Sequence, residues 1–223
     1  MTDLLPLFLH LTGRRVALIG GGRVAAGKLQ QLVAAGAEVS VIAPEIDPAI
    51  TARRHGHVEL IRRGFVPSDL DDMWLVVAAA TPEVNREVAA AAESRRVFVN
   101  AVDDPANASA FLSGVVRRDG VTIAISTSGE APALTALVRE AVDALLPSDF
   151  SAWMDIARAA RLAWKRDAVP MEQRKPKLLQ ELNARYENAR LTPRAPASRA
   201  RLVEREASAE RIPWLNAPED SWP

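Results

Sequence analysis

The feature that most constrains the fold of this chain is a glycine-rich turn between a strand pattern and a helix pattern. Residues 20–25 read Gly-Gly-Gly-Arg-Val-Ala, which fits the spacing G-x-G-x-x-A. They follow the apolar run 16–19 and precede an alanine-rich helical pattern over 24–35, which Gly36 closes. At such a turn the first glycine allows the tight bend, and the second lets the backbone approach a pyrophosphate, which then meets the free amides of the helix N-terminus. The pattern predicts dinucleotide binding, and the open alternative is a tight turn without a ligand.

Four more short apolar runs have the composition of buried strands, at 39–42, 58–61, 74–78 and 97–99, and the stretch 83–94 has a helical pattern. Strands that alternate with helices form βαβ units, whose parallel sheet is covered by helices on both faces. We therefore predict an α/β fold, with a Rossmann-type doubly wound parallel sheet over residues 1–111.

The pattern changes at residue 112. Two apolar runs, 112–116 and 121–125, flank a turn with Asp119-Gly120, a dipeptide typical of β-hairpins. A helix with apolar residues at helical spacing follows over about 133–146. Because a hairpin and one helix are small for a stable unit, we predict that residues 112–147 pack against a second subunit as a dimerisation unit.

From residue 148 to 190 the pattern is all-helical, with aromatic residues and leucines at helical spacing. We predict a C-terminal helical domain there, with one helix beginning near Asp149 and a second over about 171–189. Residues 191–223 combine prolines with charges, and we expect a poorly ordered tail.

The composition excludes several kinds of protein. There is no cysteine, which excludes disulfides, thiolate nucleophiles and cysteine-ligated metal sites. No apolar run approaches the roughly 20 residues of a membrane span, and the first residues lack the basic start and cleavage site of a signal peptide. The formal net charge is zero and no dense basic stripe is present. We expect a cytoplasmic protein with no membrane or nucleic-acid partner.

Histidine spacing gives no metal site. The three histidines are His10, His55 and His57, and they are not spaced as metal ligands. No metal-binding residue is therefore predicted.

Two adjacent acidic residues, Asp103 and Asp104, follow the predicted strand 97–99. Ligands of open α/β sheets bind outside the carboxyl ends of the strands, where such a carboxylate can act as a general base. The sequence Asp-Asp-Pro is equally typical of a simple turn, and spacing alone does not separate the two interpretations.

The predicted strand 39–42 does not end in the acidic residue that usually binds the ribose hydroxyls of NAD. Ala43 and Pro44 follow it, and Glu45 comes one or two positions late. No arginine follows at once to bind the phosphate of NADP. We expect NAD as the cofactor, with its adenosine held largely by backbone contacts.

Several short motifs occur in the same order as in one known family. They are Leu5-Pro6-Leu7-Phe8 with Leu11-x-Gly13-Arg14, the glycine turn with Lys28, Val41-x-Ala43-Pro44-Glu45, Ala79-Ala80-Thr81 with Val84-Asn85, Asn100-x-Val102-Asp103-x-Pro105, and Ala124-Ile125-Ser126-Thr127 with Pro132 and Arg139-Glu140. Over residues 4–147, and more loosely to about 190, the chain resembles the precorrin-2 dehydrogenase and sirohydrochlorin ferrochelatase family, the N-terminal module of sirohaem synthase.

The resemblance implies an enzyme of sirohaem biosynthesis, and so of porphyrin biosynthesis, that oxidises precorrin-2 to sirohydrochlorin with NAD. It implies a homodimer built from a Rossmann NAD domain, a dimerisation unit and a helical domain, with the tetrapyrrole bound between them. In bifunctional members the same site inserts Fe²⁺, which would make the oxidoreductase also a lyase. The proposed catalytic residue of the family is the aspartate of its Asn-x-Val-Asp motif, which maps onto Asp103.

On this basis we predict cofactor contacts from the glycine turn and from the ends of two further strands, by Gly20, Gly22, Arg23, Val24, Ala43, Pro44 and Thr81. Hydroxyl groups and basic side chains suit a substrate with about eight carboxylates, and the predicted substrate contacts are Ser126, Thr127, Arg117 and Lys28. Arg118 and Arg139 are further candidates by position. Each basic residue has the alternative role of a solvated surface charge. Glu130 departs from the family pattern, because it adds a negative charge to the loop that precedes Pro132.

Two other functions stay open. The first is a regulatory domain that senses NAD without chemistry, since such modules also begin with a glycine turn and dimerise. The second is a tetrapyrrole-binding protein without catalysis, which the changed loop 126–132 would fit. An essential Asp103 would separate the enzyme from both.

Overall fold

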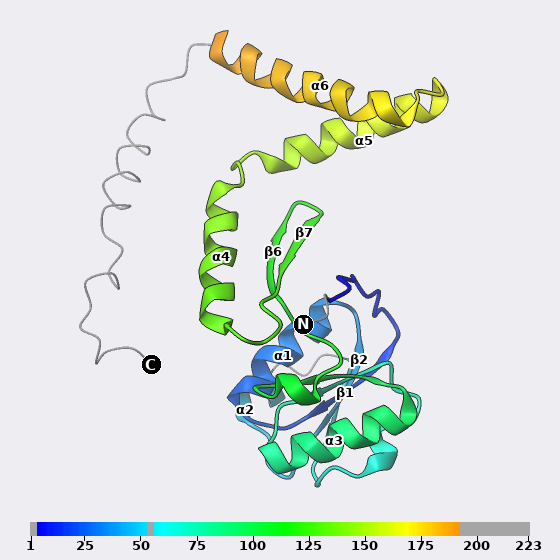
Figure 1. Cartoon of the computed structure of the whole chain (residues 1–223), viewed down its shortest axis with the longest axis vertical. Helices are drawn as coiled ribbons and strands as arrows, with labels where there is room; N and C mark the ends of the chain where they lie inside the picture. Colours follow the sequence, from blue (N-terminus) through cyan, green and yellow to red (C-terminus); the bar gives the residue numbers. More distant parts are fainter. Residues whose placement is uncertain (1–3, 53–55, 192–223) are drawn as a thin grey trace, which may run out of the picture. The chain divides into compact units, whose positions relative to one another are not determined.

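The computed structural model describes residues 4–52 and 56–191, with side chains described up to residue 186 (Figure 1). The chain divides into two compact units, residues 1–147 and residues 148–223, and each is described by itself. The tail predicted at 191–223 lies outside the described residues from position 192 onward. The finer domain boundaries predicted at 111 and 190 stay predictions.

The first unit is built on one sheet of five parallel strands in the order β3-β2-β1-β4-β5. The strands are β1 (Arg15–Ile19), β2 (Glu38–Ile42), β3 (Val58–Ile61), β4 (Leu75–Ala78) and β5 (Phe98–Ala101), and the helices between them are α1 (Arg23–Ala34), α2 (Pro48–Thr51) and α3 (Pro82–Arg95). This order confirms the predicted Rossmann-type sheet.

Helices cover both faces of the sheet, because successive side chains of a strand point to opposite sides. On one face Leu18 and Val77 lie in a common core with Leu29 of α1. On the other face Val76 lies in a second core with Val88 of α3. The two layers hold the carboxyl ends of the strands in fixed positions, and the loops that follow these ends build the site.

Three short helices were not predicted from the sequence. They are α2 and two 3₁₀ turns, η1 (Pro67–Leu70) and η2 (Pro105–Asn107). Each has proline at its first helical position, where the missing amide costs nothing. None is long enough for a helical period to show in the sequence.

A two-stranded hairpin of β6 (Gly114–Arg118) and β7 (Val121–Ile125) follows the sheet. Its turn is formed by Asp119 and Gly120, with φ angles of 48° and 88°, as a type I′ turn requires. The first strand begins two residues later than predicted, because Leu112 packs against the α1 core instead of joining the hairpin.

Helix α4 (Pro132–Leu145) packs beside the hairpin, and Arg118 of β6 forms an ion pair with Asp143 at 2.9 Å. No residue of α4 is buried. Its exposed apolar side chains are Leu134, Leu137, Val138 and Leu145. Helix α4 therefore presents an apolar surface that no other described residue of its unit covers.

The second unit is a pair of helices, α5 (Phe150–Arg166) and α6 (Met171–Leu191). The indole nitrogen of Trp153 donates a hydrogen bond of 2.6 Å to the hydroxyl of Tyr186, and Arg185 pairs with Asp149 at 3.0 Å. These contacts join the start of α5 to the later part of α6, as the helical stripes predicted. Within the described residues, no helix has the length and apolar character to cross a membrane.

Candidate active site

Four loops gather at the carboxyl edge of the sheet, because all five strands run in the same direction. They follow β1 at residues 20–22, β2 at 43–47, β4 at 79–81 and β5 at 102–104. The strand order reverses between β1 and β4, and ligands of doubly wound sheets bind at such a switch point. The residues predicted for cofactor and catalysis come from these four loops, except Arg23 and Val24, which begin α1.

The glycine turn after β1 needs glycine for two separate reasons. Gly20 has a φ of 122°, and a Cβ there would lie 2.2 Å from the carbonyl oxygen of Ala79. At Gly21 a Cβ would lie 1.9 Å from the carbonyl oxygen of Glu45. These two glycines therefore let the turn fit between the loops after β4 and β2, and the amide of Asp47 further fixes it by donating to the Gly21 carbonyl at 2.8 Å.

Gly22 is different, because a Cβ there would meet nothing within 4 Å. It is the residue before α1, which begins with no side-chain cap and no acidic residue in its first turn. Open space above an uncapped helix N-terminus is what a pyrophosphate requires. The residues present thus fit the phosphates of a dinucleotide.

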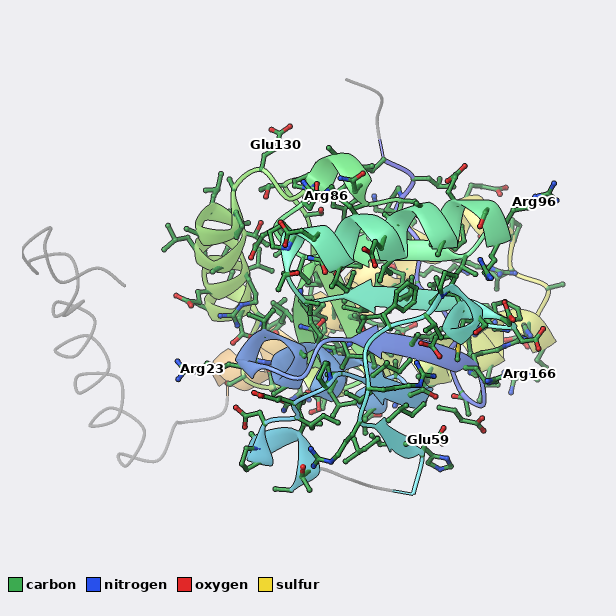
Figure 2. All side chains as sticks on the ribbon, turned by 90° about the horizontal axis from the view of Figure 1, so that it is seen from below. Arg23, Glu59, Arg86, Arg96, Glu130 and Arg166 are labelled. Carbon is green, nitrogen blue, oxygen red and sulfur yellow. The ribbon has the colours of Figure 1, made fainter. Side chains whose placement is uncertain are left out.

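The other predicted cofactor residues surround this turn. Arg23 and Val24 are exposed at the start of α1, and Figure 2 shows the Arg23 side chain extending outward. Ala43 is buried and Pro44 exposed after β2. Thr81 is the residue before α3, and its hydroxyl oxygen accepts from the amide of Val84 at 3.5 Å.

A pocket of about 320 Å³ lies beside this edge, bounded by α1, the loop after β5, the hairpin and α4. Four predicted residues line it, namely Asp103, Lys28, Ser126 and Thr127. Arg117 does not line it and is exposed on β6. Arg139 of α4, a further candidate, does line it. The pocket therefore combines acidic, basic and hydroxyl groups from elements far apart in the sequence.

The two aspartates of the pocket are held differently. Asp103 is exposed and has a φ of 58°, a left-handed conformation that is uncommon outside glycine and that clusters at functional sites. Asp104 accepts a hydrogen bond from Asn107 at 2.8 Å. The Asp103 carboxylate accepts no hydrogen bond from the described part of the chain, so it is the one available to a ligand.

Lys28 is half-buried in the pocket wall. Burial lowers the pKa of Lys28, and the negative charge of Asp103 partly opposes this by raising it. The charges of Lys28 and Asp103 therefore attract each other in the pocket.

The hydroxyl of Thr127 is already engaged. Its oxygen accepts from the amide of Ala131 at 3.2 Å and lies 2.9 Å from the hydroxyl of Thr135, which bonds back to the Ala131 carbonyl at 3.3 Å. Ser126 accepts from the amide of Ser128 at 3.1 Å and keeps its own proton for donation. Of the two predicted hydroxyl donors, Ser126 is thus the one with a proton to offer.

Ion pairs and side-chain direction distinguish the other charged residues near the pocket, Arg139, Arg118 and Glu130. Arg139 lies 3.0 Å from Glu140, and Arg118 is occupied by Asp143. Glu130 does not line the pocket, and Figure 2 shows its side chain pointing outward. The negative charge of Glu130 is therefore directed away from the pocket wall.

Two asparagines that the sequence analysis named within motifs, but without a role, are buried at this edge. The Asn85 oxygen accepts from the amide of Ala80 at 3.0 Å, and its nitrogen donates to the Val102 carbonyl at 3.4 Å. Asn100 lies in β5 and lines the pocket. A buried polar residue requires a partner, but nothing local in the sequence shows that these positions are buried.

Two family models match the chain in succession. Residues 7–114 match proteins described as putative NAD(P)-binding, and residues 118–145 match the central part of sirohaem biosynthesis proteins. The first domain is thus one that binds a nicotinamide dinucleotide.

Known proteins agree with these matches. Siroheme synthase of Photorhabdus laumondii is 39% identical over 186 residues, which are 82% of this chain and 40% of that protein. Siroheme synthase of Tolumonas auensis is 40% identical over 156 residues, which are 70% of this chain and 33% of that protein. The chain therefore spans well under half of the length of these relatives.

A solved structure shares the fold. SirC, precorrin-2 dehydrogenase, superposes with a TM-score of 0.60 at 21% identity, over 79% of this chain and 88% of that one. The two successive family models and the siroheme synthase relatives confirm the resemblance inferred from the motifs, and this superposition confirms the fold. Residues 7–145 of the chain thus belong to the NAD(P)-binding and central domains of the sirohaem biosynthesis family.

Proposed function

We propose that this chain oxidises precorrin-2 to sirohydrochlorin with NAD. The observation that carries the proposal is the placement of Asp103, whose free carboxylate lines a pocket on the same sheet edge as the glycine turn. A sensing domain needs the turn but gives no role to this carboxylate. A carrier protein would need the pocket but not the open glycine turn.

The cofactor residues act by position and backbone. Gly22 leaves room for the pyrophosphate above the start of α1, where Arg23 and Val24 flank it, and Gly20 lets the turn pass close to the Ala79 carbonyl. Ala43 and Pro44 border the adenosine side, and Thr81 the nicotinamide side. The chemistry that the nicotinamide supplies when bound is acceptance of a hydride.

NAD rather than NADP suits the loop after β2. Glu45 and Asp47 are the charged residues of that loop, and no lysine or arginine occurs from residue 43 to 52. A carboxylate favours ribose hydroxyls and repels the extra phosphate of NADP. We therefore expect kcat/KM to be at least about tenfold higher with NAD⁺ than with NADP⁺.

The substrate is the tetrapyrrole, and the basic residues of the pocket bind its carboxylates. Lys28 of α1 and Arg139 of α4 both line the pocket, and Ser126 adds a hydroxyl donor. Arg117 is exposed on the hairpin and would bind a carboxylate beyond the pocket rim.

Asp103 acts as the proton acceptor. The oxidation removes two hydrogens from precorrin-2, one as a hydride and one as a proton. A carboxylate without competing hydrogen bonds can take the proton, and a positioned base contributes about 10²–10⁴-fold to the rate. Asp104 is less suited, because Asn107 already occupies its carboxylate.

Insertion of Fe²⁺ into the product is a second proposed activity at the same site. Here the metal is a substrate, and its binding to the macrocycle displaces two N–H protons. Asp103, whose side chain is exposed in the pocket, receives them one at a time and passes each to solvent.

The protein acts as a homodimer in the cytoplasm in this proposal. The uncovered apolar surface of α4 and the hairpin supports the dimer, since the exposed fractions of Leu137 and Leu145 are 47% and 82%. Burying such a surface is favourable by about 25 cal/mol per Å².

The test is anaerobic incubation of the purified protein with precorrin-2 and NAD⁺, followed by visible spectroscopy and then by Fe²⁺ addition. We expect sirohydrochlorin to form only with NAD⁺, and sirohaem to form faster than without protein. The Asp103→Asn variant should lose at least about 100-fold in kcat, whereas Asp104→Asn should retain most of it. Full activity of Asp103→Asn would rule out its role, and no NAD⁺-dependent change with the native chain would refute the dehydrogenase.

A further inference from the structure

The amino edge of the five-stranded sheet, opposite to the candidate active site, carries two exposed aromatic side chains. Trp74 lies directly before β4, and Phe98 is the first residue of β5. Their exposed fractions are 54% and 52%, although aromatic residues are mostly buried in folded proteins. Both line one open hollow together with Asp72 and Arg96. Neighbouring aromatic side chains exposed in this way are typical of an interaction surface.

Arginines surround the two rings. The Arg14 guanidinium carbon lies 3.7 Å from the centroid of the Trp74 ring, which is a cation–π contact. Arg15 lies 4.0 Å from Asp72, and both side chains are largely exposed, so this pair is weak. Arg96 is exposed, and within the described part of the chain its side chain has no acidic partner. Three arginines thus face one acidic residue, and the surface suits an acidic ligand.

Two residues of this surface have backbone conformations that favour glycine. The φ angles of Asp72 and Arg96 are 60° and 56°, and Arg96 is the residue that follows α3. Glycine is the usual residue at such a helix end, because it has no Cβ to strain the left-handed conformation. Other residues held in this conformation cluster at functional sites. The arginine at the end of α3 therefore points to a use for its guanidinium group.

The six residues together define the amino-edge surface, which consists of Arg14, Arg15, Asp72, Trp74, Arg96 and Phe98. A small-molecule site buries most of its ligand, whereas the two rings here flank a hollow that stays open to solvent. Exposed arginines beside aromatic rings are instead typical of contacts with another polypeptide. The occupant should supply carboxylates to the arginines and aromatic rings to Trp74 and Phe98.

The chain itself contains a segment of this composition, and the segment lies outside the described residues. Residues 213–223 include Trp214 and Trp222, two of the five tryptophans of the chain. Their charged residues are Glu219 and Asp220, with no lysine or arginine. The segment is therefore acidic and aromatic, although the chain as a whole has no net charge.

We propose that residues 213–223 of the chain dock on the amino-edge surface, with a tryptophan against Trp74 and Phe98 and with the carboxylates on the arginines. Opposite charges and paired aromatic rings both favour this contact. No particular arrangement of the two units is needed, because residues 192–212 can span roughly 70 Å when extended. The inference does not depend on the proposed function, since the surface lies at the other edge of the sheet from the active site.

The experiment measures, by fluorescence anisotropy, how a fluorescein-labelled synthetic peptide of residues 213–223 binds to the full chain. One receptor is the native chain, whose own segment competes with the peptide. The other is the double variant Trp214→Ala/Trp222→Ala, in which the surface is free. A second peptide, with glutamine in place of Glu219 and Asp220, tests the two negative charges.

We expect the double variant to bind the peptide at least about tenfold more tightly than the native chain does, because a tethered segment competes at a high effective concentration. The glutamine peptide should bind the double variant about tenfold more weakly than the acidic peptide. Added salt should weaken binding of the acidic peptide more than that of the glutamine peptide, since it screens the charges.

Arg96→Gly, made in the double variant, should weaken binding of the acidic peptide about tenfold. This variant should fold, since glycine suits the φ of 56° at this position. Arg86→Ala in the same background is the matched control, because Figure 2 shows Arg86 and Arg96 at opposite ends of α3; its affinity for the peptide should be unchanged. Trp74→Ala removes the ring and should weaken binding as Arg96→Gly does.

Equal affinity of the native chain and the double variant for the peptide would overturn the inference, in favour of an acidic segment of another protein as the occupant. Absence of binding to the double variant would overturn it outright. Binding that neither Arg96→Gly nor Trp74→Ala weakens would place the segment on a different surface, and so would also refute the inference.

Discussion

At the scale of single residues, three consecutive glycines have three different environments. Gly20 and Gly21 have no room for a Cβ, since backbone oxygens lie 2.2 Å and 1.9 Å from where it would be. A Cβ at Gly22 would meet nothing within 4 Å. Packing of the protein itself explains the first two glycines, and a bound pyrophosphate is the proposed reason for the third.

This difference predicts opposite effects of two alanine substitutions. Gly20→Ala should destabilise the fold by about 3 kcal/mol, because alanine is strained at its positive φ and collides with a backbone carbonyl. Gly22→Ala should cost no more than about 1 kcal/mol of stability but should weaken NAD⁺ binding. Thermal unfolding and calorimetric titration with NAD⁺ measure the two effects. Equal losses of stability in both variants would contradict this division of roles.

At the scale of secondary-structure elements, α3 holds together two loops of the site through Asn85. This residue is 4% exposed, and its amide bridges the loop after β4 and the loop that carries Asp103. The start of α3 therefore ties the loop after β4 to the loop that carries Asp103.

Loss of this bridge should affect both folding and turnover. Asn85→Ala leaves a buried amide and a carbonyl without partners, which should cost about 2 kcal/mol of unfolding free energy and lower kcat. Ser94→Ala is the control, because it removes a hydrogen bond of the same helix, to the Ala91 carbonyl at 2.9 Å, away from the site. Urea unfolding and steady-state kinetics report the two quantities. Native kcat in Asn85→Ala would show that the bridge has no role in positioning.

The segment after β3 depends on an ion pair, and this gives stability a dependence on pH. Burial by itself would raise the pKa of Asp69, but hydrogen bonds from Arg63 and from the Val66 amide, with the Arg63 charge, lower it below 3.8. A lowered folded-state pKa means that the pair stabilises the protein above about pH 4 and that this is lost as the pH falls further.

Asp69→Asn should therefore be less stable than the native chain at pH 7, and the difference should shrink below pH 4. Asp71→Asn provides a comparison, because Asp71 pairs with Arg95 at 2.8 Å but its side chain is 61% exposed; such a pair contributes little. Denaturant unfolding at several pH values tests this. A stability difference for Asp69→Asn that does not vary with pH would argue against the ion pair as its cause.

At the scale of the whole molecule, α4 has an apolar surface that the rest of the first unit does not cover. Helix α4 has 14 residues, and each of them is at least partly exposed. A second copy of the chain is the partner that the proposal assigns to this surface.

A single charge on α4 should dissociate the proposed dimer. Val138→Glu would bury an unpaired carboxylate in the interface, which is strongly unfavourable, so the mass in solution should fall from dimer to monomer. Val66→Glu serves as the control, since the exposed fractions of Val138 and Val66 are 39% and 42% but Val66 lies before η1. Light scattering distinguishes the two masses. Dimerisation of Val138→Glu at native strength would place the interface elsewhere.

Local patterns determined most of the architecture. The five strands were predicted because each is a short apolar run, and α1 and α3 because their alanine-rich stretches are long enough to identify. Because strands and helices alternate, the sequence predicts a parallel sheet, and ligands of such sheets bind at the carboxyl ends of the strands. The motifs around Gly20 and Asp103 likewise carried the family assignment, since each is contiguous in the sequence.

What only the tertiary structure decided depends on contacts between segments far apart in the chain. The sequence ranks Lys28, Arg117 and Arg139 alike as basic residues, but only the folded chain places Lys28 and Arg139 in one pocket with Asp103 and leaves Arg117 outside it. The burial of the Asn100 amide is of the same kind, because it follows from the packing of β5, α1 and the segment at Ala110. Secondary structure follows from short-range periodicity, whereas burial and pairing of a polar group are set by neighbours that the sequence does not place beside it.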